Sequence, residues 1–327
     1  MSKNYRWGII GAGRIAHKFC TALNAVEGSE VYAIASRDPD KGKAYANQFH
    51  ASKIYTNYDD LLADENVDIV YIAVPHAFHY DQTLKCLHHN KAVLCEKPMA
   101  LSYRQTKKMF HVATEKKLFL MEGMWTSCMP FIEKIKSIIS GDIIGTPQYL
   151  SADFGFTAPV DPEGRLFNKK LGGGSMMDVG IYPLFLATLI FGEPTLIKTV
   201  SKLTTTEVDE YVNIVLQYEH GETAHLVSSI SFNTDIEAEI IGTKGRIKIK
   251  NPWFKATDFS VHLNDGTIQD YSIPHLSNGF EHEIQEVMHC LDNGLLESPK
   301  MSHHLSMAVS KTREKILQQA GVVYKYP

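Results

Sequence analysis

The first 16 residues constrain the fold more than any other part of the chain. A short apolar run at residues 6–10 passes directly into the motif Gly-Ala-Gly-Arg-Ile-Ala at residues 11–16, and a helical pattern of apolar residues follows. In this context Gly11 allows a tight turn, and Gly13 allows the backbone to approach a pyrophosphate at the positive end of the helix. The motif therefore predicts a dinucleotide-binding turn with four candidate cofactor contacts: Gly11, Gly13, Arg14 and Ile15.

The rest of the first 123 residues alternates between apolar strands and helical patterns. Apolar runs at residues 31–35, 69–74, 92–95 and 118–121 are separated by stretches with helical spacing. Strands separated by helices imply right-handed crossovers and a parallel sheet with helices on both faces. We therefore predict a doubly wound Rossmann domain over residues 1–123.

The pattern changes within residues 124–327, where short apolar runs follow one another with little helix between them. These runs lie at residues 148–156, 197–202, 212–218, 223–230, 238–241 and 246–249. Turn sequences such as His220-Gly221 separate them, which is typical of antiparallel strands. We predict a C-terminal α/β domain with a largely antiparallel open sheet, which binds the substrate and mediates dimerisation.

An open sheet also bears on assembly. If no helix covers its outer face, that face leaves an apolar surface that monomers seldom tolerate. We therefore expect a homodimer formed through this sheet, with residues 223–231 as a candidate part of the contact surface.

The composition excludes several classes of protein. The chain has 327 residues, a formal net charge of -4 and five cysteines. This charge gives no reason to expect a nucleic-acid partner, and widely spaced cysteines in an odd number argue against a disulfide framework. The longest apolar run, at residues 181–191, is shorter than the ~20 residues that span a bilayer. Because the first strand begins too near Met1 for a signal peptide, we expect a soluble, cytoplasmic protein without a membrane partner.

The end of the second strand bears on the choice of cofactor. It reads Ala35-Ser36-Arg37-Asp38. An acidic residue at this place binds the ribose 2′-hydroxyl of NAD, whereas a hydroxyl and a guanidinium suit the 2′-phosphate of NADP. Asp38 leaves two alternatives open, since it can cap the next helix or bind a ribose. We expect NADP, with Ser36 and Arg37 as contacts, and NAD as the alternative.

Two further segments follow strands at the carboxyl edge of the predicted sheet, where ligands bind in doubly wound folds. Pro75, His76 and His79 follow the run at residues 69–74, and Glu96-Lys97-Pro98 follows the run at residues 92–95. A surface turn is the ordinary explanation for such residues. Their place at this edge makes Pro75, His76, His79, Glu96 and Lys97 candidate cofactor contacts.

A glycine-rich segment in the second half of the chain supplies the other candidate group. Residues 172–183 read Gly-Gly-Gly-Ser-Met-Met-Asp-Val-Gly-Ile-Tyr-Pro, and three successive glycines allow backbone close to a ligand. If the segment after the glycines is already helical, Asp178 and Tyr182 share one face. If instead the helix begins at Pro183, the two need not share a face.

The four motifs together resemble the glucose–fructose oxidoreductase/inositol dehydrogenase (Gfo/Idh/MocA) family, and most of all its dihydrodiol dehydrogenase and NADP-linked D-xylose dehydrogenase branch. They lie at residues 11–16, 96–98 and 172–183, described above, and at residues 121–125, which read Met-Glu-Gly-Met-Trp. The resemblance implies a Rossmann domain followed by an α/β domain with an open sheet. It also implies that Lys97 acts with Tyr182 and that Asp178 supports them. Many members carry His at the place of Tyr182, and the Thr-Ser-Cys at residues 126–128 lacks the arginine expected after Trp-Thr.

The chemistry of these residues suits hydride transfer from a hydroxyl carbon, which requires removal of the hydroxyl proton. A free tyrosine, with a pKa near ~10, is a poor base at neutral pH unless a cation lies close to it. Our hypothesis is that Tyr182 is the general base for oxidation and the acid for reduction. Lys97 supplies the cation and binds the reacting oxygen, and Asp178 orients the pair.

The resemblance implies a sugar, polyol or cyclic trans-dihydrodiol as the substrate. Arg165 is the one arginine that we consider for an anionic substrate, but Asp161 and Glu163 lie beside it in sequence and would repel an anion. Arg165 can also pair with one of those carboxylates. We therefore expect oxidation of neutral polyols and none of 2-hydroxy acids.

Two other functions remain as alternatives: a catalytically silent NADP-binding regulatory protein, and a structural dimer module whose glycine turn binds nothing. We expect no metal site. His303-His304, and His282 with His289, lack the His-Glu-x-x-His pattern of zinc enzymes.

Overall fold

The computed structural model describes residues 4–324. The chain divides into two compact units, one formed by Met1–Cys128 with His275–Ser306 and the other by Met129–Pro274 with Met307–Pro327. The first unit therefore takes residues from both sides of the boundary predicted between residues 123 and 124.

The first unit contains a six-stranded parallel sheet. Its strands, in spatial order, are β3 (Lys53–Tyr55), β2 (Ser29–Ala35), β1 (Tyr5–Ile10), β4 (Ile69–Ile72), β5 (Ala92–Glu96) and β6 (Leu120–Gly123). Each neighbouring pair is parallel. This is the strand order of a dinucleotide-binding Rossmann fold, which confirms the fold class predicted for this part of the chain.

Helices connect these strands and bury a core of aromatic and aliphatic side chains. They are α1 (Arg14–Leu23), α2 (Pro39–Phe49), α3 (Tyr58–Ala63), α4 (His79–His88) and α5 (Tyr103–Lys116). Phe19 of α1 stacks on Tyr71 of β4 with ring centroids 3.7 Å apart. A later helix, α8 (Glu281–Asp292), belongs to the same unit, and Phe280 just before it stacks on Trp125 at 4.3 Å.

The second unit contains an eight-stranded sheet. Its strands, in spatial order, are β14 (Ile268–Ser272), β13 (Asp258–Leu263), β12 (Gly245–Ile249), β11 (Ala238–Gly242), β7 (Pro147–Gly155), β10 (Thr223–Ser229), β9 (Asp209–Gln217) and β8 (Leu196–Leu203). The neighbours β7 and β10 run parallel, and every other pair is antiparallel. The prediction of a largely antiparallel sheet is confirmed.

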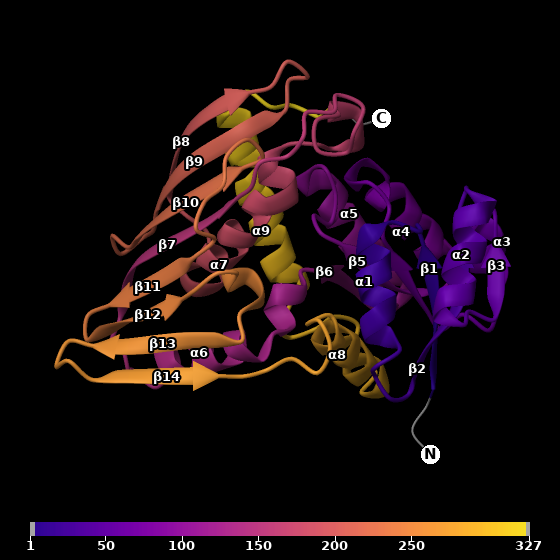
Figure 1. The fold of residues 1–327 in the computed structure, drawn as a ribbon, viewed down its shortest axis with the longest axis horizontal. Coiled ribbons are helices and arrows are strands. Elements are labelled where there is room, and N and C mark those ends of the chain that lie inside the picture. The colour runs from indigo at the N-terminus through magenta and orange to yellow at the C-terminus, as the bar shows by residue number, and fades with distance from the viewer. Residues whose placement is uncertain (1–3, 325–327) are drawn as a thin grey trace. The chain divides into compact units, whose positions relative to one another are not determined.

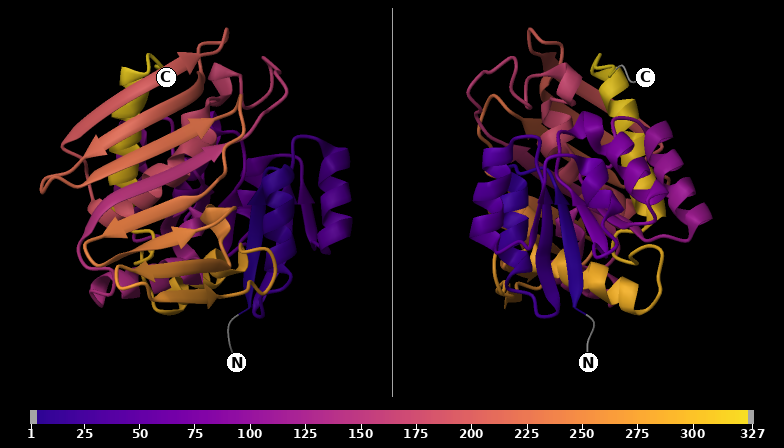
Figure 2. Two further views of the ribbon diagram at one scale, coloured as in Figure 1. Left: turned by 60° about the vertical axis from the view of Figure 1, so that its left-hand side comes forward. Right: turned by 90° about the vertical axis from the view of Figure 1, so that its right-hand side faces the viewer.

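Helices cover one face of this sheet. Figure 1 shows α6 (Pro130–Ser140), α7 (Ile181–Phe191) and α9 (His303–Gln319) behind the strands, and the left view of Figure 2 shows the opposite face toward the viewer. Within residues 4–324 no helix covers that opposite face. Val200 and Val215 are 69% and 47% exposed on the strands β8 and β9.

The helical stretch Lys169–Phe191 is long and apolar enough to cross a membrane by length and composition alone, with a mean hydropathy of 1.5. However, 83% of its most apolar window is buried inside the protein. Leu184, Phe185 and Leu186 have no exposed surface. The stretch therefore has the burial of a core helix rather than that of a membrane span.

Candidate active site

The glycine turn between β1 and α1 has the geometry that the motif predicts. Gly11 has a φ of +101°, and a Cβ added to it would lie 2.7 Å from the carbonyl oxygen of Ala73. Both the backbone conformation and the close approach to the next strand therefore require glycine here. At Gly13, by contrast, the nearest described heavy atom to an added Cβ would be 4.0 Å away. The space beside Gly13 is open, as it must be if a ligand is to lie against this backbone.

The helix that follows offers its first amide groups to that space. Gly13 is the N-cap of α1 and, among residues 4–324, no side chain caps the first N–H groups of this helix. The Tyr45 hydroxyl donates a hydrogen bond to the Gly13 backbone oxygen at 2.5 Å and leaves those N–H groups free of a cap. Arg14 is exposed and Ile15 is half-buried on the first turn, which carries no acidic residue. An uncapped helix N-terminus beside a glycine turn fits a dinucleotide pyrophosphate, because its N–H groups and its dipole both favour an anion. The predicted contacts Gly11, Gly13, Arg14 and Ile15 thus lie on one turn whose geometry suits an anion, and their contact with the cofactor stays a prediction.

The structure shows that Asp38 caps the next helix, which is one of its two predicted alternatives. The Asp38 carboxylate accepts hydrogen bonds from the backbone N–H groups of Asp40 and Lys41, both at 3.1 Å, and so caps α2. These contacts, led by the one from Lys41, lower the pKa of Asp38. Ser36 is buried at the end of β2, and the Arg37 guanidinium lies 6.0 Å from the centre of the Phe78 ring. Ser36 and Arg37 thus offer a hydroxyl and a guanidinium at the carboxyl end of β2.

The segment after β4 is held by one of its histidines. His79 is fully buried, and its ring nitrogens lie 2.9 Å from the backbone oxygens of Pro98 and Val74. It thus ties this segment to the one after β5. Pro75 and His76 are half-buried on the stretch that His79 anchors. Direct cofactor contact by Pro75, His76 or His79 stays a prediction.

Glu96 and Lys97 stand at the end of β5, where Lys97 precedes a cis proline, Pro98. The Glu96 side chain is buried; one oxygen accepts a hydrogen bond from the Tyr71 hydroxyl at 2.5 Å, and the other accepts one from the Lys97 backbone N–H at 3.2 Å. Burial, followed by the charge of Glu96, raises the pKa of Tyr71 well above its usual value. Tyr71 therefore stays a neutral donor that fixes Glu96, and Glu96 fixes the backbone of Lys97.

Two further carboxyl groups, Glu122 and Glu283, lie near this strand end and were not predicted as part of the site. Glu122, at the end of β6, accepts a hydrogen bond from the Met99 backbone N–H at 2.8 Å. Neither oxygen of Glu283 in α8 has a hydrogen-bond partner among the described residues. Burial and then the charge of Glu96 raise the pKa of Glu283 well above its usual value, which favours its neutral form. Glu122 belongs to the motif at residues 121–125, so the sequence offered a signal for it. No sequence pattern connects Glu283 with Glu96.

In the second unit, the glycine-rich segment leads into one continuous helical stretch. A π-helical turn, Met176–Gly180, contains Asp178 and passes directly into α7, which contains Tyr182 in its first turn. The structure therefore supports the first of the two alternatives, a segment that is already helical before Pro183. Because Pro183 has no N–H and its ring crowds the carbonyl four residues earlier, a widened turn before it relieves that clash.

Packing against the sheet holds Tyr182 and the π-helical turn before it. The Tyr182 ring is mostly buried, with ring centroids 5.6 Å from Phe154 and 5.3 Å from Phe254. A Cβ added to Gly180 would lie 2.8 Å from the Ser228 hydroxyl oxygen, so glycine lets the π-helical turn lie against β10. Strand β7 thus supplies Phe154, and strand β10 supplies the support for the helix start.

Arg165 pairs with Asp178 rather than with the carboxylates near it in sequence. The guanidinium Nη1 donates to the Asp178 Oδ1 at 2.7 Å, and Nη2 lies 3.5 Å from the other oxygen. The Arg165 side chain is 56% exposed and that of Asp178 is 10% exposed. The pairing predicted with Asp161 or Glu163 is therefore replaced by one with a candidate catalytic residue.

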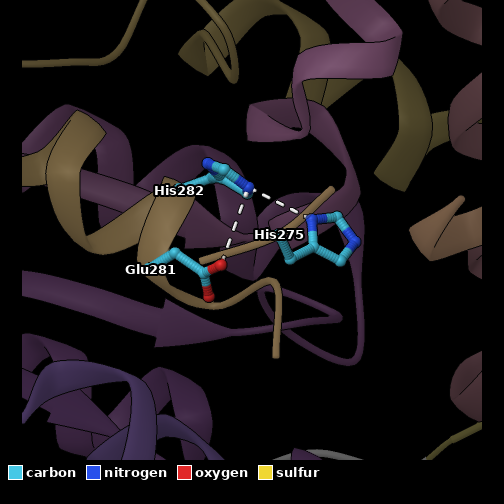
Figure 3. Close-up of side chains that lie close together, drawn as sticks. All are labelled: His275, Glu281 and His282. Carbon is cyan, nitrogen blue, oxygen red and sulfur yellow. Dashed lines mark hydrogen bonds and ion pairs between the residues drawn. The ribbon is translucent and has the colours of Figure 1, made fainter. Parts of the chain in front are cut away.

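A cluster formed by His275, Glu281 and His282 lies at the start of α8 (Figure 3). His275 Nδ1 lies 3.2 Å from His282 Nε2, which lies 3.8 Å from a Glu281 oxygen. The Glu281 carboxylate accepts hydrogen bonds from three backbone N–H groups, those of Ser277, Asn278 and Gly279. The cluster has a structural explanation: Glu281 holds the loop that precedes α8, and the two histidines hydrogen-bond to each other.

The candidate cofactor contacts all lie in the first unit, at the ends of the neighbouring strands β2, β1, β4 and β5. Asp178 and Tyr182 lie in the second unit together with Arg165. The joint action of Lys97 with Tyr182 therefore remains a prediction.

These features define an oxidoreductase with an NAD-binding domain. The model of the oxidoreductase family with an NAD-binding Rossmann fold (Gfo/Idh/MocA) matches residues 5–124, and the model of the Gfo/Idh/MocA C-terminal domain matches residues 132–248. The chain belongs to the Gfo/Idh/MocA oxidoreductase family.

Its curated relatives are similar over their full length. The chain is 35% identical to trans-1,2-dihydrobenzene-1,2-diol dehydrogenase of Xenopus tropicalis, covering 98% of this chain and 99% of that one. It is 30% identical to the enzyme of the same name from Homo sapiens, covering 98% of both chains.

Solved structures of two other enzymes have the same fold. An aldose–aldose oxidoreductase from Caulobacter crescentus, complexed with glycerol, is 26% identical with a TM-score of 0.87, covering 98% of both chains. A 3-ketoreductase from Actinomadura kijaniata, in complex with NADP and TDP-benzene, is 25% identical with a TM-score of 0.86, covering 97% of this chain and 98% of that one.

Proposed function

We propose that this oxidoreductase is an NADP-preferring dehydrogenase that acts on a CH–OH group of a cyclic trans-dihydrodiol, a sugar or a polyol. The observation that carries the proposal is the joint position of Asp178 and Tyr182. Both lie on one helical stretch, with Asp178 paired to Arg165 at 2.7 Å. In an oxidoreductase of this family, Tyr182 supported by Asp178 can serve as the acid and base that such a reaction needs.

The preference for NADP rests on the end of β2. Asp38 caps α2 through two backbone N–H groups, which supports its role as a helix cap over a role as the ribose-binding acid. Ser36 and Arg37 remain to meet a 2′-phosphate, which Arg binds with a bidentate fork. The 3-ketoreductase structure contains NADP, and NAD is the alternative cofactor here.

The proposal assigns roles in the reaction to Tyr182, Lys97 and Asp178. When bound, the nicotinamide accepts or gives the hydride. Tyr182 takes the hydroxyl proton of the substrate during oxidation and returns it during reduction. The Lys97 ammonium favours the phenolate form of Tyr182 and hydrogen-bonds to the reacting oxygen, and Asp178 orients the two.

The substrate class rests on the relatives and on Arg165. The curated relatives are named for a trans-dihydrodiol, and one of the similar solved structures is an aldose–aldose oxidoreductase. In this chain the Asp178 carboxylate pairs with the Arg165 guanidinium and offsets its charge. Arg165 therefore attracts an anionic substrate only weakly. Neutral hydroxyl groups suit such a mixed polar surface better than a carboxylate.

A turnover screen tests the proposal. The purified chain is assayed with NAD and with NADP against trans-dihydrodiols, aldoses, inositols and 2-hydroxy acids. We expect NADP-linked oxidation of at least one neutral diol or sugar, and none of the acids. A preference for lactate-like acids would overturn the substrate class. Cofactor binding without turnover on any substrate would instead favour the silent regulatory protein, and no cofactor binding would favour the structural module.

We further propose that the protein is cytoplasmic and forms a homodimer through the outer face of the eight-stranded sheet. All five cysteines are buried as free thiols, which suits a reducing compartment. Strand β10 presents Thr223, His225 and Val227 to the side opposite its buried residues, and Val200 and Val215 add apolar area. Sedimentation at micromolar concentration should give a dimer that the double substitution Val200→Lys with Val215→Lys converts to monomers. A monomer in the unmodified chain would overturn this assembly.

A further inference from the structure

A buried carboxylate holds the start of the helical stretch that carries Asp178 and Tyr182. Asp209, the first residue of β9, has no exposed surface. Its Oδ2 accepts hydrogen bonds from the Ser175 hydroxyl at 2.7 Å and from the Met176 backbone N–H at 2.6 Å. Met176 begins the π-helical turn, so Asp209 binds the chain at the residue where the helical stretch starts.

The glycines before this point are fitted to the same carboxylate. Gly174 has a φ of +112°, and a Cβ added to it would lie 2.3 Å from the Asp209 Oδ1 and 3.2 Å from the Tyr324 hydroxyl oxygen. The Tyr324 hydroxyl donates a hydrogen bond to the backbone oxygen of Gly173. The glycine-rich segment is therefore held between Asp209 and Tyr324, and a side chain at Gly174 would displace it.

The anchoring extends to the neighbouring strand. The Ser175 hydroxyl oxygen lies 3.0 Å from that of Ser228 on β10, which is also the strand against which Gly180 packs. A carboxylate at a helix N-terminus also interacts favourably with the helix dipole. Asp178 stands two residues after Met176, and Tyr182 follows in the next turn, so small movements of this anchor shift both side chains.

We infer that Asp209 is a positioning residue for the reaction, whose ionised carboxylate fixes the helical stretch and thereby the placement of Asp178 and Tyr182. This inference rests on the proposed function of those two residues. Asp209 itself acts through Ser175 and Met176.

The protonation state of Asp209 is open to change near neutral pH. Burial raises the pKa of Asp209 to about 6, and the hydrogen bonds from Ser175 and Met176 oppose that rise. The carboxylate is therefore ionised at pH 7.5 and protonated at pH 5. Protonation converts two charge-assisted hydrogen bonds into neutral ones, which are roughly half as strong. Oδ1 has no hydrogen-bond partner among the described residues and is the oxygen open to the proton.

The Tyr324 hydroxyl and the Arg313 guanidinium beside Asp209 keep their protonation states in this range. Burial, followed by the charge of Asp209, raises the pKa of Tyr324 well above its usual value, so that its hydroxyl stays neutral. The buried Arg313 of α9, which opposes that rise, stays charged. The strand β10 contributes the uncharged hydroxyl of Ser228, which lies 3.0 Å from that of Ser175. On either side of Asp209 in sequence, Glu207 pairs with Lys169 and Glu210 pairs with Lys202.

The test compares the pH profiles of wild type and Asp209→Asn, which has the shape and charge of the protonated acid. At pH 7.5 we expect kcat to fall about tenfold, with the dissociation constant of NADP unchanged. The ratio of wild-type to variant kcat should approach one as the pH falls below 6, because both then carry a neutral group. Glu210→Gln, a neutralised carboxylate next to Asp209, is the matched control and should give a ratio near one at every pH. A ratio for Asp209→Asn that does not change with pH overturns the inference.

A second measurement separates this inference from the proposed function. Hydrogen exchange of residues 172–182 at pH 7.5 should be faster in Asp209→Asn than in wild type, and unchanged in Glu210→Gln. Equal exchange in all three proteins would refute the positioning role even if the enzyme is active. Faster exchange in Asp209→Asn, combined with a wild type that turns over no substrate, would instead count against the proposed function alone. If Asp209→Asn does not fold, Ser175→Ala removes one donor and keeps the carboxylate, and should change exchange and kcat in the same direction by less.

Discussion

Asp178 and Arg165 form an ion pair at 2.7 Å although 13 positions separate them in sequence. The pair joins a half-exposed guanidinium to a mostly buried carboxylate on the π-helical turn. Arg165 thereby fixes the candidate catalytic residue Asp178 from the outside, while Asp209 fixes the start of the turn from the inside.

Removal of Arg165 tests the first of these contacts. In Arg165→Ala we expect kcat to fall about tenfold, because Asp178 loses the partner that orients it. The free energy of unfolding should change by less than ~1 kcal/mol, since the pair is half-exposed. Lys169→Ala, which removes the exposed pair with Glu207, is the control and should leave kcat unchanged. An Arg165→Ala enzyme with wild-type kcat at every pH would contradict the role given to the pair.

The two glycines of the cofactor turn should respond differently to the same substitution. Gly11→Ala places a Cβ 2.7 Å from the Ala73 carbonyl oxygen at a φ of +101°, so it should lower the free energy of unfolding by ~1–3 kcal/mol. Gly13→Ala meets open space and should leave stability unchanged but weaken the binding of NADPH. Thermal unfolding and fluorescence titration measure the two effects. Equal NADPH affinity in Gly13→Ala and wild type would show that no ligand lies against this residue.

Cofactor choice is tested at Arg37. Arg37→Ala should weaken NADP binding by ~1–3 kcal/mol, as expected for lost hydrogen bonds to a charged group, and should change NAD binding little. Asp38→Asn is the control, because asparagine also caps helices and should keep the ratio of the two dissociation constants. Equal dissociation constants for NAD and NADP in the unmodified chain would exclude the proposed preference.

Stability should depend on pH through Asp209. Its pKa is about 6 in the folded protein against a usual value of 3.8, so the folded state binds the proton more tightly. The stability that this proton contributes is present below pH ~4 and is lost as the pH rises through 6, because the desolvation cost of the buried carboxylate exceeds the gain from its stronger hydrogen bonds to Ser175 and Met176. Wild type should therefore lose on the order of 2–3 kcal/mol relative to Asp209→Asn between pH 4 and 7. Urea unfolding of both proteins at several pH values measures this difference, and parallel curves would contradict the assigned pKa.

Local patterns predicted much of this fold because they determine local structure. The motif at residues 11–16 and the apolar runs of the first unit carry their own strand and turn signals, and β1, β2, β4 and β5 lie where those runs predict. The strands β3, β13 and β14 were not predicted. Lys53–Tyr55 is only three residues long, and Ile268–Ser272 is half-buried or exposed along its whole length, so neither has an apolar alternation to detect.

The contacts among the candidate site residues were harder to predict than the candidates themselves. Asp178 and Tyr182 were recognisable from their motif, but the π-helical turn between them depends on packing against β10 and on Pro183. The support from Asp209 comes from a residue more than 30 positions away in sequence. No local pattern marks such a contact, because the strand that brings Asp209 there is placed by the whole sheet.

The joint action of Lys97 and Tyr182 is the central claim, and a double-mutant cycle on turnover tests it most directly. Tyr182→Phe and Lys97→Met should each lower kcat by at least ~10²-fold while NADP binding survives. Because the two residues act as one unit, the double variant should be little worse than either single variant. A Tyr182→Phe enzyme that keeps most of its turnover, or losses that multiply in the double variant, would contradict the account.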